Sequence, residues 1–138
     1  MYRFLLALAL GGLTTAAAMA QDPVKVDPNH YTVESENADV RILRFHYGPH
    51  EKSVMHSHPN LVAVFLTDMR TKMTTPDGKS QEVIGKAGQA QWEPAGSHLP
   101  ENLGDKPIEG ILVEFKTKAA AKSAAKATGA KPATKPAS

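Results

Sequence analysis

The chain has 138 residues, with 16 lysines and arginines, 14 aspartates and glutamates, and no cysteine. Without cysteine it can form neither disulfides nor a lipid anchor on a thiol, so its stability must come from a packed core, a metal or oligomerisation. Residues 21–115 hold 9 basic residues and all 14 acids, a net charge of about −5, whereas residues 116–138 carry about +6.

The first twenty residues have the pattern of a secretory signal peptide. Arg3 gives the positive start, residues 4–13 the apolar core, and Ala18-Met-Ala20 a small-x-small cleavage site. We therefore expect residues 1–20 to be removed on export and the mature protein to be periplasmic or secreted. The apolar run is too short to span about 30 Å of hydrocarbon, so no transmembrane segment is expected.

Residues 31–115 show no helical period, and short runs with strand character alternate with turn signals. The expected strands are Tyr31–Glu34, Val40–Tyr47, Val54–Ser57, Leu61–Leu66, Lys72–Thr75, Gln81–Ile84, Gln89–Glu93 and Ile108–Phe115. Thr75-Pro-Asp-Gly78 predicts a tight turn, because Pro fixes φ and Gly accepts a positive φ. The pattern predicts one all-β domain over residues 21–115, either a sandwich or a closed jelly roll. A domain this small buries modest surface, and a homodimer would bury more.

Two histidines one residue apart, His56 and His58, are the candidate metal ligands of the first half of the chain. Side chains alternate along a strand, so both imidazoles project to the same side and can hold one cation. A third histidine, His98, ends the segment Pro94-Ala-Gly96-Ser-His98, which we interpret as a turn. Ligands for a metal inside a barrel must lie on inward faces of different strands, and these three histidines could supply them.

The two histidine segments resemble the paired motifs of the cupin superfamily. The first motif runs Gly, five or more residues, His-x-His, three or four residues and Glu, and here Gly48 leads to His56-Ser-His58. The second runs Gly, five residues, Pro-x-Gly, one or two residues, His, three residues and Asn, and residues 88–102 match it nearly throughout. The resemblance covers roughly residues 40–115 and implies a cupin-type double-stranded β-helix, which is a jelly-roll barrel.

The resemblance further implies a divalent metal, Fe, Mn, Ni, Cu or Zn, held by His56, His58 and His98, with open positions for a small molecule. The glutamate that commonly completes the family's site falls at Val62 or Ala63, which have no donor atom. If the protein folds after export, the affinity order favours Cu and Zn. An enzyme of this kind would be an oxygenase or isomerase acting on a small organic acid. The alternative is a metal-free barrel that binds or senses a small ligand.

Several further residues have open alternatives. His46 and His50 are proton carriers at the cavity mouth or exposed residues. Glu93 and Glu101 are a replacement carboxylate or general base, or solvated turn positions. Asn102 is expected to cap a turn, with Gly48, Pro94 and Gly96 as turn residues supporting the site.

The register of two strands is undecided, which leaves the faces of Arg44 and Trp92 open. If the even-numbered residues of 40–46 point inward, Arg44 is a buried cation that awaits an anionic ligand. If Leu43, Phe45 and Tyr47 point inward, Arg44 lies on the surface.

Residues 116–138 are rich in Ala, Lys and Pro and contain no acid. This composition is typical of a disordered solubilising tail with weak attraction to anionic surfaces, although a few helical turns are an alternative. Nothing in it resembles a nucleic-acid-binding fold, so we expect no specific nucleic-acid partner.

Overall fold

The computed structural model describes residues 21–117, so the expected signal peptide and almost all of the expected tail lie outside the described residues. The chain order of the elements is α1 (Pro23–Val26), β1 (Tyr31–Glu36), β2 (Val40–Tyr47), β3 (His56–His58), β4 (Leu61–Phe65), β5 (Met69–Thr74), β6 (Ser80–Gly85), β7 (Ala90–Glu93), β8 (Gly96–Asn102) and β9 (Ile108–Phe115). In this range the only helix has four residues, so none of the described helices can cross a membrane.

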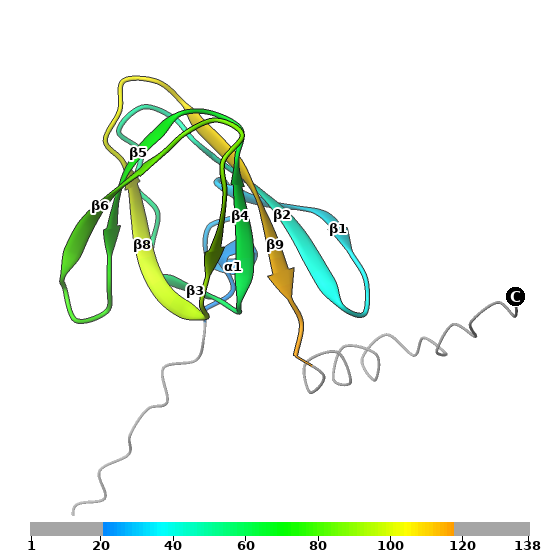
Figure 1. Cartoon of the computed structure of the whole chain (residues 1–138). Helices are drawn as coiled ribbons and strands as arrows, with labels where there is room; N and C mark the ends of the chain where they lie inside the picture. The colour runs from blue at the N-terminus through cyan, green and yellow to red at the C-terminus, as the bar shows by residue number, and fades with distance from the viewer. Residues whose placement is uncertain (1–20, 118–138) are drawn as a thin grey trace, which may run out of the picture.

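The strands form two antiparallel sheets that enclose the core (Figure 1). One sheet has the order β1-β2-β9-β4-β7 and the other β3-β8-β5-β6. This arrangement confirms the expected all-β jelly roll. The bounds of β2 and β9 agree with the prediction to the residue, and the tight turn at 75–78 joins β5 to β6 with Gly78 at φ 82°.

The turn expected at residues 94–98 is shorter than predicted: the chain bends at Pro94 and Ala95, is extended from Gly96 and continues as β8 to Asn102. Glycine, proline and asparagine have low strand propensity, which hides the strand in the sequence. Tertiary pairing determines its conformation instead, since β8 pairs with β3 on one side and with β5 on the other. The Pro100 carbonyl also accepts a hydrogen bond from the Ser53 amide at 2.9 Å.

The inward face of β2 consists of Leu43, Phe45 and Tyr47, all buried. Of the two alternatives for this strand, the one that places Arg44 on the surface is therefore correct. The Arg44 guanidinium pairs with Glu34 at 2.5 Å and with Glu109 at 2.7 Å. It is not a cation inside the barrel.

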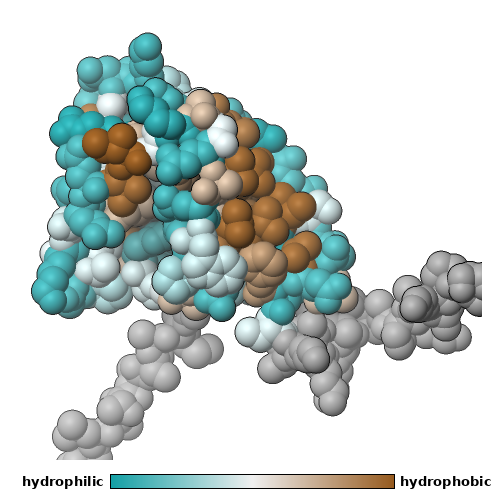
Figure 2. Space-filling view, viewed as in Figure 1, coloured by the Kyte–Doolittle hydropathy of each residue, from teal (hydrophilic) through white to brown (hydrophobic). Residues whose placement is uncertain are grey.

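The outer face of the five-stranded sheet is partly apolar. Trp92 is 58% exposed and its ring centroid lies 5.6 Å from that of Phe115, so its side chain points away from the barrel interior. Figure 2 shows apolar surface gathered over β4 and β9. The expected homodimer is not tested by a single chain and stays a prediction.

Asn102 caps the turn after β8, as expected, and is almost completely buried. Its amide nitrogen donates to the carbonyls of Gly48 and Lys106, each at 2.9 Å, and its Oδ1 accepts from the Gly104 amide at 2.9 Å. The side chain thereby joins the loop after β2 to the loop before β9.

We expect Leu43→Ala to lower the free energy of unfolding by about 2–5 kcal/mol, because Leu43 is 0% exposed and truncation leaves a cavity. Ile84→Ala is the matched control, since Ile84 is 66% exposed and should change stability by less than about 0.5 kcal/mol. Urea unfolding of both variants measures the difference. Equal effects would show that β2 does not face the core.

Candidate metal centre

Three histidines from two paired strands converge inside the barrel. His56 and His58 come from β3, and His98 comes from β8, directly opposite His56 in the antiparallel register. One ring nitrogen of each lies within 4.8 Å of the others. The structure therefore brings together the three residues that the sequence singled out.

The ring of His56 is held in one orientation. Its Nδ1 lies 2.8 Å from the Val54 carbonyl oxygen and 3.3 Å from the Ser53 hydroxyl. A carbonyl can only accept, so Nδ1 must carry the hydrogen. The other nitrogen, Nε2, is buried and contacts no hydrogen-bonding partner in the described chain.

His58 is held by a buried carboxylate. Its Nδ1 lies 2.6 Å from Oε1 of Glu114, and Oε2 of Glu114 accepts from Nε of Arg41 at 2.7 Å. Nη1 of Arg41 in turn donates to Asp22 at 2.8 Å. Burial disfavours the ionised form of Glu114, but the hydrogen bonds from His58 and Arg41 outweigh it and lower its pKa. Nε2 of His58 is likewise buried without a partner in the described residues.

The surroundings keep two of the imidazoles unprotonated. Burial, followed by the neighbouring His58, lowers the pKa of His56 to about 4. Burial and the two neighbouring histidines lower the pKa of His98 to about 3. Neutral imidazole is the form that binds metal ions, so at neutral pH no proton has to be released from these two rings.

Further side chains pack behind the histidines. The Tyr31 ring lies with its centroid 4.9 Å from that of His56, and its hydroxyl accepts from Tyr47 at 2.7 Å. Asp27 accepts from Nδ1 of His30 at 2.8 Å and from the Ser53 hydroxyl. Ser53 thereby links Asp27 to the Nδ1 side of His56.

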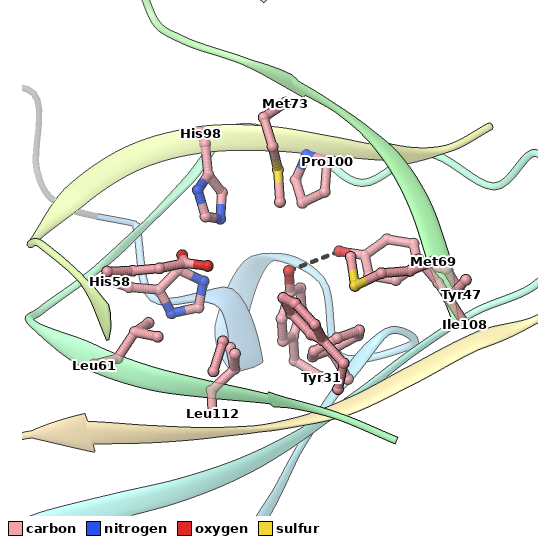
Figure 3. A pocket seen from close by; sticks show the side chains of 14 residues that line it. Tyr31, Tyr47, His58, Leu61, Met69, Met73, His98, Pro100, Ile108 and Leu112 are labelled. Atoms are coloured by element: carbon pink, nitrogen blue, oxygen red, sulfur yellow. Dashed lines mark hydrogen bonds between the residues drawn. The ribbon is translucent and has the colours of Figure 1, made fainter. Parts of the chain in front are cut away.

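Two adjoining cavities reach the histidines, and Figure 3 shows the inner one. The inner cavity has a volume of about 40 Å³ and is mainly apolar, with room for about two or three waters. The outer cavity has a volume of about 250 Å³ and a more polar wall. Five residues line both: His58, Leu61, Met73, Glu93 and His98. A ligand in either cavity would contact two of the three histidines.

Most of the other candidates lie away from this centre. His46 is exposed, and His50 is exposed and paired with Asp105 at 2.9 Å. Glu101 pairs with Lys72 at 3.0 Å. None of these three candidates lines either cavity, whereas Glu93 lines both.

The positions expected for the missing glutamate have the predicted lack of donor atoms. Ala63 lines the inner cavity and Val62 lies on the other face of β4. A carboxylate beside the cluster comes from Glu114 of β9, which orients His58 and does not belong to the group of clustered ligand atoms. Sequence reasoning missed it, although a signal was present: in β9 Glu114 shares the inward parity of Ile108, Gly110 and Leu112, where an acid is unusual.

The chain is similar to known proteins in its three-dimensional structure. No family model and no curated protein matches the chain. A cupin domain from Bordetella pertussis Tohama I is 25% identical with a TM-score of 0.59, covering 63% of this chain and 92% of that domain. A protein with a double-stranded β-helix domain from Klebsiella pneumoniae is 20% identical with a TM-score of 0.51, covering 62% and 74%.

We expect the metal-free protein to lose stability as the pH falls from about 6.5. An unfolded histidine takes up a proton near pH 6.5, whereas His56 and His98 in the folded state resist protonation down to about pH 4 and 3. In that window the unfolded state binds more protons, so each such group lowers stability by at most about 1.4 kcal/mol per pH unit. His98→Gln should therefore show a shallower decline in urea unfolding between pH 7 and 4. His50→Gln, at an exposed position, is the control, and identical slopes for all three proteins would contradict the prediction.

Proposed function

Because this chain is a cupin with the double-stranded β-helix fold of that superfamily, we propose that it holds one divalent transition metal on His56, His58 and His98 and binds a small molecule beside it. One observation carries the proposal. The Nε2 atoms of His56 and His58 are buried with no hydrogen-bonding partner in the described chain. Leaving a buried polar atom unsatisfied costs about 1–3 kcal/mol, and a shared ion removes this cost for both nitrogens at once.

The residues behind the ligands suit this role. A metal-binding imidazole commonly donates its second N–H to a carbonyl or a carboxylate, which fixes the tautomer and the direction of the ring. His56 does so toward Val54 and His58 toward Glu114. The Nε2 lone pairs of His56 and His58 would therefore be available to bind one ion shared with His98. His98 completes the set from the neighbouring strand.

The bound metal would act as a Lewis acid with open coordination positions, since three protein ligands leave room for water or substrate. The chain's own residues would do the rest. Leu61 and Met73 line the space beside His58 and His98 and would hold the apolar part of a small molecule. Activity as an oxygenase or isomerase is compatible with this arrangement and is part of the proposal.

Export is the second part of the proposal. Residues 1–20 support it by their signal-peptide pattern. An exported chain that folds outside the cytoplasm would meet Cu and Zn with the affinity order in their favour. We therefore propose Zn or Cu as the ion bound in the periplasm or outside the cell.

The double variant His56→Ala, His58→Ala should lose nearly all bound metal, from about one ion per chain to close to none, because a single remaining imidazole binds weakly. Elemental analysis after loading with Zn and gel filtration measures the stoichiometry. His46→Ala, His50→Ala is the matched control, since both residues are exposed and outside the cavities. Full retention by the first variant would refute His56 and His58 as metal ligands, whereas a wild type that binds no metal would favour the metal-free ligand-binding barrel.

Glu114→Gln should weaken metal binding by about 10- to 100-fold, because the amide carries no negative charge and its single oxygen cannot accept from both His58 and Arg41. Glu109→Gln is the matched control on the same strand, where the carboxylate pairs with Arg44 on the outside. Competition with a chromophoric chelator gives both affinities. Equal affinities would show that Glu114 has no influence on the ligand.

A further inference from the structure

The distribution of ion pairs identifies one acid as different from the rest. All 14 acidic residues lie within the described range, and twelve of them lie against a lysine, arginine or histidine. The two that do not are Asp39 and Glu93. Asp39 is exposed in the turn between β1 and β2, where water solvates it, whereas Glu93 is half-buried.

Glu93 lies at the junction of the two cavities. It is the last residue of β7 and stands opposite Leu61 of β4 in the register, so the two share the inward face. Its Oε1 accepts a hydrogen bond from Nε2 of Gln91 at 3.0 Å. It does not belong to the group of side chains whose ligand atoms lie within 4.8 Å of one another. Its carboxylate is thus directed at the space for a ligand rather than included among the metal-binding nitrogens.

Among the residues that the structure describes, no lysine and no arginine lines either cavity. Arg44, which the sequence offered as a cation for an anionic ligand, is paired on the outside. Arg41 is paired with Glu114 and Asp22. In the metal-free protein an organic anion would therefore meet a carboxylate in the cavity and no side-chain cation to balance its own charge.

We propose that the cavity takes a small organic ammonium ion, with the amine at Glu93 and a short alkyl chain directed at Leu61 and the inner cavity. A partly buried carboxylate without a counter-ion is costly, and a bound cation offsets that cost. The inner cavity accepts only about two or three non-hydrogen atoms, so an alkyl chain of roughly four carbons spans the junction. The inference names the ligand class of the proposed site, and in that sense it rests on the proposed function.

The test compares three four-carbon probes, n-butylamine, 1-butanol and n-butyrate, by calorimetric titration at about pH 8, where the amine is protonated and histidine is ordinarily neutral. Metal-free and Zn-loaded protein are titrated separately. We expect n-butylamine to bind at least about tenfold more tightly than 1-butanol, and n-butyrate to bind most weakly to the metal-free protein. Glu93→Gln should reduce amine affinity about tenfold or more and keep the Zn stoichiometry of the wild type. Asp39→Asn, which removes the same charge at an exposed position, should change neither.

If the amine binds no better than the alcohol, or if Glu93→Gln binds it as the wild type does, the inference is overturned. If Glu93→Gln loses Zn, Glu93 is a metal ligand and the inference is again overturned. If the wild type binds no Zn but the preference for the amine persists and depends on Glu93, the metal proposal fails while the ligand class stands.

Discussion

The antiparallel pairing of β3 with β8 is the constraint on which the centre depends. It places His56 opposite His98 and leaves His58 one pleat further along the same face. On the other face, the hydroxyls of Ser57 and Ser97 meet at 2.6 Å. A slip of one residue in this register would exchange the two faces and send the imidazoles outward. The three-histidine cluster is therefore a property of strand register rather than of any single side chain.

Behind the histidines, each of the two buried carboxylates accepts hydrogen bonds from neighbouring side chains. Glu114 is ionised between His58 and Arg41, and Asp27 accepts from His30 and Ser53. The imidazoles of His56 and His98 are kept neutral by burial. Among the described residues, the Nε2 atoms of His56 and His58 remain buried without a hydrogen-bonding partner, and the carboxylate of Glu93 at the cavity junction has an amide partner but no basic one. A metal and a cationic ligand would compensate these two different features.

Much of this was accessible from the sequence, and the exceptions have physical reasons. Strand alternation was enough to place His56 and His58 on one face, and the second motif supplied His98. Local propensity around His98 favours a turn, and pairing with β3 and with β5 overrides it. The sequence leaves the parity of β2 open because its outward set also contains two apolar residues, Val40 and Ile42. Glu114 is far from the motifs in sequence and becomes part of the site only when β9 closes the sheet.

X-ray absorption at the zinc edge of the Zn-loaded protein tests the central claim most directly, because it reports the ligands of the ion itself. The account predicts one Zn per chain with three imidazole nitrogens at about 2.0–2.1 Å. A first shell of oxygen alone, or of a single imidazole, would contradict it.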